Sequence, residues 1–176
     1  LELCQRAGDQ YGIGNALNVL SFIDVDIADH LQRAQQALQA FETAGYAERK
    51  AIVLGNLALT YSELGLYPHA HRLQSQTLEM SRGMGANLSL TYALSNLLDL
   101  EIKLGALDLA HAHSQEFAEL VPALGDPSLE VNFASSLGDM ALAESNPKTA
   151  VLHYKSAAQI AHQAELGRET IDLTLL

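Results

Sequence analysis

Apolar residues recur every three or four positions along most of this chain. The clearest stretch is 51–64, where one apolar face is formed by Leu54, Leu57, Ala58, Tyr61 and Leu64. This spacing predicts an amphipathic helix. Gly65 ends that helix, because glycine adopts a positive φ at low cost, and Pro68 suits the start of the next helix. A second helix over 69–82 then ends at Gly83-Met84-Gly85, so the unit is a helix, a tight turn, a helix and a loop.

The same unit recurs at a step of forty residues. Four ladders share this step: Ala70, Ala110 and Ala150; Gly45, Gly85 and Gly125; Asn56, Asn96 and Ser136; Leu57, Leu97 and Leu137. A fixed period of this length is typical of repeat proteins. The pattern predicts an all-α fold with units at about 9–45, 46–85, 86–125 and 126–167, and partial units at 1–8 and 168–176. The predicted helix pairs are 13–22 with 28–44, 51–64 with 69–82, 88–104 with 109–124, and 129–144 with 148–165.

The repeats diverge at three places. His30 replaces the ladder alanine in the first unit, whose turn 23–26 has no glycine, and Ser145 replaces a turn glycine in the fourth. The end of the chain carries Ile171, Leu173, Leu175 and Leu176, where a solenoid end normally needs a polar cap. These residues predict that the repeats continue or that the segment packs on a partner chain.

Charge and composition restrict the possible partners. The 176 residues include 10 basic and 21 acidic ones, and the net charge is −11. Nucleic acids and anionic membrane surfaces are therefore disfavoured, because both need a basic footprint. No apolar run approaches the roughly 20 residues that span a bilayer. Cys4 is the single cysteine, so no intrachain disulfide is possible, and a cytoplasmic location is the default expectation.

The second and third units resemble the tetratricopeptide repeat (TPR). The matching residues are Leu54-Gly-Asn-Leu-Ala-Leu-Thr-Tyr61, Leu64-Gly-Leu-Tyr67 and Ala70, then Leu94, Asn96, Leu97, Leu104-Gly-Ala-Leu107 and Ala110; Leu137-Gly-Asp, Ala150, Tyr154 and Ala157 match in the fourth unit. The resemblance implies a TPR-like solenoid, a right-handed superhelix of helix-turn-helix repeats, covering residues 1–176. A period of 40 rather than about 34 resembles the longer-helix subgroup of large bacterial regulators, such as maltose-regulator-type activators and cyclase-linked sensors.

No residue pattern predicts catalysis, a metal or a cofactor, so we expect that the chain is not an enzyme. His69 and His71, and likewise His111 and His113, are two residues apart and point about 200° apart on a helix. Equivalent histidines in adjacent repeats would lie roughly 10 Å apart. That distance is too long for a shared zinc ion, which binds each ligand at about 2 Å. We therefore expect surface or helix-capping histidines.

The resemblance implies that the first helix of each pair lines a concave wall. The expected partner-binding residues are Asn18, Ser21, Leu59, Ser62, Glu63, Tyr92, Ser95, Asp99, Lys103, Asn132, Ser135 and Asp139, with Gly55 on the same wall. These groups suit a protein or an extended peptide of basic or amphipathic character, although they could equally be merely solvated. Asn56 and Asn96 would either bond a ligand or brace a neighbouring helix, and we favour the brace.

The leading functional hypothesis is a non-catalytic protein- or peptide-interaction module, a scaffold within a bacterial signal-transduction or transcription-regulatory protein. Two alternatives remain open. One is self-association through the terminal apolar helices, and the other is a small-molecule sensor domain of a regulator.

Overall fold

The computed structural model describes residues 1–24 and 26–164. These residues are helical apart from short connections and contain no strand, which confirms the prediction of an all-α fold. The predicted apolar segment 170–176 lies outside the described residues. The helices are α1 (Glu2–Ala7), α2 (Gln10–Ser21), α3 (Ile27–Ala44), α4 (Ala47–Glu63), α5 (Tyr67–Met84), α6 (Asn87–Leu104), α7 (Leu107–Leu124), α8 (Pro127–Ala143) and α9 (Pro147–Gln163).

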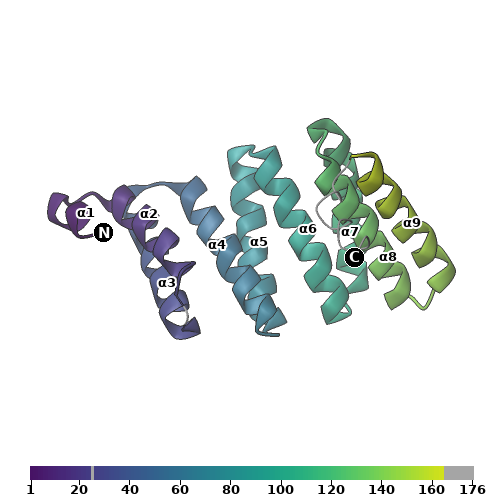
Figure 1. Ribbon diagram of the computed structural model, residues 1–176, viewed down its shortest axis with the longest axis horizontal. Helices are drawn as coiled ribbons and strands as arrows, with labels where there is room; N and C mark the ends of the chain where they lie inside the picture. The colour runs from purple at the N-terminus through teal and green to yellow at the C-terminus, as the bar shows by residue number, and fades with distance from the viewer. Residues whose placement is uncertain (25, 165–176) are drawn as a thin grey trace, which may run out of the picture. The chain divides into compact units, whose positions relative to one another are not determined.

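The chain divides into two compact units, Leu1–Ala86 and Asn87–Leu176. In the first unit α2 pairs with α3 and α4 pairs with α5, while α3 packs on α4 to join the two hairpins (Figure 1). In the second unit α6 pairs with α7 and α8 pairs with α9, and α8 packs against both α6 and α7. Each unit is thus built from two antiparallel helical hairpins.

The alanine ladder lies at the hairpin interfaces. Ala70, Ala110 and Ala150 are each at most 1% exposed. Each is in the second helix of its hairpin, where a larger side chain would force the paired helices apart. Large apolar side chains are buried in each unit as well, with Phe41 in the first and Phe117 in the second. The forty-residue ladder therefore reflects helix packing.

Glycine permits the closest contacts within two of the hairpins. A Cβ added at Gly14 of α2 would lie 2.7 Å from the ring of Phe41, and one added at Gly138 of α8 would lie 2.5 Å from the ring of Tyr154. Real Cβ atoms do not approach other atoms this closely, so a larger residue would force either the ring or the helix to shift. Both glycines are therefore required by packing.

The helices end at the predicted glycines, and some of them are longer than the apolar pattern predicted. The ladder glycines Gly45, Gly85 and Gly125 each adopt a positive φ and cap α3, α5 and α7. Helix α2 begins at residue 10 rather than 13, because the Asp9 carboxylate accepts a hydrogen bond from the Gly12 amide at 2.9 Å. Helix α5 covers 67–84 rather than 69–82, because Gly83 stays helical.

Ser145 is the one non-glycine residue with a positive φ in the described part of the chain. Its φ is 61°, while Gly65 and Gly105 have φ values of 72° and 71° in the equivalent turns. The turn chemistry has therefore changed in the fourth hairpin while the backbone conformation has been kept. A side chain in this left-handed region costs roughly 1–2 kcal/mol.

We predict that Ser145→Gly raises the free energy of unfolding by about 1 kcal/mol, because it removes this steric cost. The reverse change, Gly105→Ser, should lower it by a similar amount. Urea denaturation followed by circular dichroism measures both. A Ser145→Gly variant no more stable than the parent would contradict this explanation of the turn.

Candidate functional site

The predicted wall residues lie on the first helices of the hairpins, α2, α4, α6 and α8. All of them except Ser21 are exposed or half-buried. The prediction for Ser21 is wrong, because its side chain is buried and its hydroxyl donates a hydrogen bond to the Asn18 carbonyl at 2.8 Å. The brace assigned to Asn56 and Asn96 is also not seen, since neither side-chain amide makes a hydrogen bond to a described residue.

In the second unit the predicted acidic residues are already engaged. Lys103 Nζ lies 2.7 Å from Asp99 Oδ2, so these two exposed charges offset each other. The Tyr154 hydroxyl donates a hydrogen bond of 2.5 Å to Asp139 Oδ1. That bond is the main cause that raises the pKa of Tyr154 to about 12, with loss of hydration and the Asp139 charge adding to it. Both of these wall carboxylates are therefore less available to bond a ligand than their residue types suggest.

Two of the seven histidines pair with glutamates in the second unit. His111 Nε2 lies 2.5 Å from Glu144 Oε1 near the surface. His113 Nδ1 lies 2.9 and 3.0 Å from the two carboxylate oxygens of Glu101, which is fully buried on α6. Within residues 1–24 and 26–164, no three His, Cys, Asp or Glu side chains converge as metal ligands.

Sequence reasoning did not single out Glu101, although a signal was present. The residue follows Leu94 by seven positions and Leu97 by four, so it lies on the apolar face of α6. An acidic residue at such a position needs a buried partner, which the fold supplies from α7. The pair is a candidate structural bond within the second unit.

The first unit contains a small cavity beside the divergent residue His30. Its volume is about 180 Å³, and its lining residues are Ser21, Phe22, Asp24, Ile27, His30, Thr60 and Glu63. They come from the end of α2, the following turn, the start of α3 and the end of α4. The sequence marked His30 only as a missing alanine, so it did not predict that these segments would meet.

His30 connects three helices at this cavity. Its Nδ1 lies 2.7 Å from the Ser21 carbonyl oxygen of α2, and its Nε2 lies 2.9 Å from Thr60 Oγ1 of α4. A carbonyl oxygen can only accept, so Nδ1 carries a proton and donates it to this bond. Helices α6 and α8 pack directly, whereas α2 and α4 share no comparable contact among the described residues. The imidazole therefore spans the gap between α2 and α4.

An exposed stripe on α4 leads to this cavity. Ile52, Gly55, Leu59 and Glu63 follow helical spacing on one face, and Ile52 and Leu59 are 40% and 46% exposed. Gly55 interrupts the stripe in the middle of the helix, where glycine costs about 1 kcal/mol relative to alanine. A Cβ added there would meet only Thr77 Cγ2, at an ordinary contact distance of 3.9 Å. Packing does not require this glycine.

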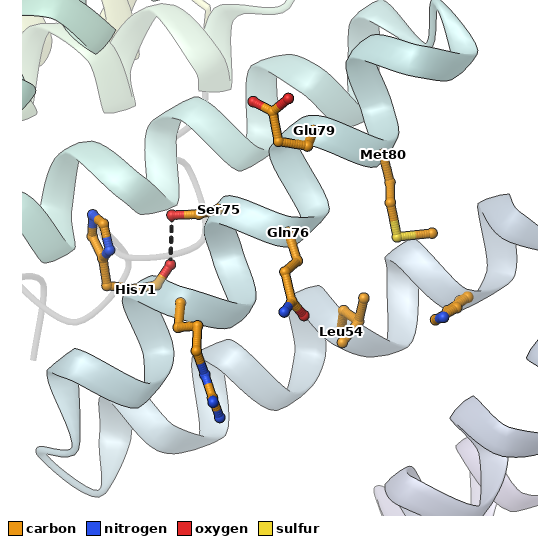
Figure 2. A pocket seen from close by; sticks show the side chains of 8 residues that line it. Leu54, His71, Ser75, Gln76, Glu79 and Met80 are labelled. Atoms are coloured by element: carbon orange, nitrogen blue, oxygen red, sulfur yellow. Dashed lines mark hydrogen bonds between the residues drawn. The ribbon is translucent and has the colours of Figure 1, made fainter.

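A second, larger hollow of about 740 Å³ lies on α4 and α5, lined by Lys50, Leu54, His71, Arg72, Ser75, Gln76, Glu79 and Met80. Figure 2 shows Gln76 and Met80 directed toward the helix that carries Leu54, with Glu79 directed the other way. This volume is in the range of small-ligand pockets, roughly 300–1,000 Å³.

Two of the charged residues at the rim of this hollow, Lys50 and Glu79, are paired. Lys50 lies 2.7 Å from Glu42, and Glu79 lies 2.6 Å from Arg82. The Ser75 hydroxyl donates to the His71 carbonyl of its own helix, as the dashed line in Figure 2 marks.

Comparisons with known proteins inform the fold alone. No family model matches the sequence, and no curated protein matches it. Among similar solved structures is the crystal structure of BtubC (BKLC) from P. vanneervenii, with 18% identity and a TM-score of 0.69 over 89% of this chain. The match covers 66% of the BtubC chain, so the present chain spans just under two thirds of that protein. At this identity the likeness supports a shared arrangement of helices.

We predict that Asp139→Ala lowers the pKa of Tyr154 from about 12 toward its ordinary value of 10. In the parent protein the hydrogen bond favours the neutral phenol. Its contribution to stability is complete below pH 10 and is lost as the pH rises through 12. Ultraviolet titration of phenolate absorbance measures the shift, and Tyr154→Phe identifies the contribution of this tyrosine. Identical titrations of the parent and Asp139→Ala would contradict the assignment.

Proposed function

We propose that this chain is a non-catalytic module that binds a protein or an extended peptide along the exposed faces of its first helices. The observation that carries the proposal is a contrast between two sets of equivalent positions. The buried ladder keeps Ala70, Ala110 and Ala150 unchanged. The exposed positions one repeat apart instead hold Ile52, Tyr92 and Asn132, or Leu59, Asp99 and Asp139. A constant scaffold with a varied exposed face suits recognition of different groups along one ligand.

The proposed architecture is a TPR-like right-handed superhelix, in which these faces would form one concave wall. The forty-residue period, the antiparallel hairpins and the likeness to BtubC in helix arrangement support this architecture. Backbone groups of an extended peptide would bond to the amide and hydroxyl side chains of the wall, such as Asn132 and Ser135. Apolar side chains of the peptide would contact Leu59 and Tyr92, which are both partly exposed.

From the resemblance of the repeats we further propose that this module belongs to a larger bacterial regulator in the cytoplasm. In such a protein, ligand binding would select one curvature of the repeat array and thereby change the state of an attached effector domain. A ligand can shift that equilibrium only as far as it prefers one curvature over the other. This mechanism requires that the ligand contact more than one hairpin at the same time.

Selection of peptides from a phage-displayed library tests the proposal. We expect the parent protein to enrich a convergent sequence, and the double variant Tyr92→Ala, Asp139→Ala to bind the enriched peptide about tenfold more weakly, which equals about 1.4 kcal/mol. Val151→Ala is the matched control, because Val151 is exposed on the second helix α9. Failure to enrich any convergent sequence, or equal loss of affinity in the control, would contradict the proposed function.

A further inference from the structure

The stripe on α4 contains a gap that could accept one apolar side chain of a ligand. Gly55 leaves a gap between Ile52 and Leu59, which precede and follow it by about one turn each. Both flanking side chains are partly exposed, and the gap is not filled by another part of the first unit, since an added Cβ would have open space apart from Thr77. This differs from Gly14 and Gly138, which are pressed against aromatic rings.

The same stripe ends at Glu63, a carboxylate that faces the cavity beside His30. Glu63 is exposed and makes no hydrogen bond or ion pair with a described residue. Asp24, which also lines the cavity, has a side chain that is only 10% exposed. Its Oδ2 accepts no hydrogen bond, although Arg33 Nε lies 3.2 Å away and offsets part of its charge. The cavity therefore has one free and one partly compensated carboxylate.

The remaining walls of the cavity restrict what can enter it. Phe22 and Ile27 are exposed apolar residues at its mouth, and an aromatic face next to carboxylates attracts cations. His30 and Thr60 already bond to each other, so they form a fixed polar wall. At about 180 Å³ the cavity is smaller than the roughly 300–1,000 Å³ of pockets for drug-sized ligands. It has the size and charge for one lysine or arginine side chain.

The distance from the gap at Gly55 to the cavity beside His30 sets the spacing between the two side chains of the ligand that would bind there. Gly55 and Glu63 are eight residues apart on a helix, or about 12 Å at 1.5 Å per residue. An extended peptide covers that distance in about four residues. We propose that the first unit binds an extended peptide that carries an apolar side chain over Gly55 and a lysine or arginine, about four residues away, in the cavity beside His30. This inference rests on the proposed function and names the chemistry of the ligand.

The overall charge of the chain favours such a ligand. A net charge of −11 attracts basic segments and speeds their association at low salt. An apolar side chain of the ligand in the gap at Gly55 adds contact that salt does not screen. The affinity of a peptide that binds both at Gly55 and in the cavity beside His30 should therefore fall as the salt concentration rises, but binding should not disappear.

Designed peptides test this inference directly. The probes are fluorescein-labelled peptides of glycine and serine that contain one leucine and one arginine four residues apart, in both orders. The comparison peptides have a spacing of two residues, or glutamine in place of arginine. Fluorescence anisotropy should show that one order of the four-residue spacing binds at least tenfold more tightly than either comparison peptide. Equal affinity for all of these peptides would overturn the inference.

Variants of the protein test the gap at Gly55 and the cavity beside His30 separately. Gly55→Leu fills the gap and should weaken binding of the best peptide about tenfold, whereas Gly83→Leu is the matched control because a side chain at Gly83 has open space. Glu63→Gln should weaken binding of the arginine peptide about fivefold and leave the glutamine peptide unchanged. Glu119→Gln makes the same change in net charge elsewhere and should have no effect. Circular dichroism checks that each variant is folded.

The phage selection separates failure of this inference from failure of the proposed function. If enriched peptides bind the parent protein but lack this spacing and are unaffected by Gly55→Leu and Glu63→Gln, the inference is wrong and the proposed function stands. If neither the enriched nor the designed peptides bind, both are wrong. Enriched peptides that lose affinity in both variants support the inference.

Discussion

Close approach of paired helices is the constraint on which this structure depends. Two helices can pack at short range only where one of them presents a small side chain. Ala70, Ala110 and Ala150 provide that small side chain in three hairpins, and each is buried. Gly14 and Gly138 allow an aromatic ring to lie directly on a neighbouring helix. Because the alanine contacts recur at a fixed step of forty residues, one packing solution is used several times along the chain.

The candidate site lies where the alanine ladder is interrupted. His30 occupies the ladder position in the first hairpin, and its imidazole bonds to the Ser21 carbonyl and to Thr60. First helices α6 and α8 pack directly in the second unit, whereas in the first unit the His30 side chain bridges α2 and α4. The space beside that bridge is the small cavity with Asp24 and Glu63. His30 thus forms a structural bond beside a recess that is lined by the Glu63 carboxylate and by the Asp24 carboxylate, which Arg33 partly compensates.

Most of the fold follows from local sequence signals, whereas the site depends on contacts between distant residues. Apolar spacing and glycine position predict helices and turns, because both act within a few residues of the chain. The meeting of His30 with Thr60 could not be predicted, since it depends on how two hairpins pack. Ser21 was misplaced for the same reason, because the burial of its side chain depends on tertiary packing around the end of α2. Glu101 could have been found, because an acidic residue stood on an apolar face.

The most direct measurement of the central claim is the free energy of unfolding of Ala110→Leu compared with Ala112→Leu. Both alanines are in α7, but Ala110 is buried and Ala112 is exposed. Leucine and alanine both favour helix, so the comparison isolates overpacking. The account predicts a loss of roughly 1–3 kcal/mol for Ala110→Leu and almost none for Ala112→Leu. Equal stability of the two variants would contradict the claim that small residues set the distance between paired helices.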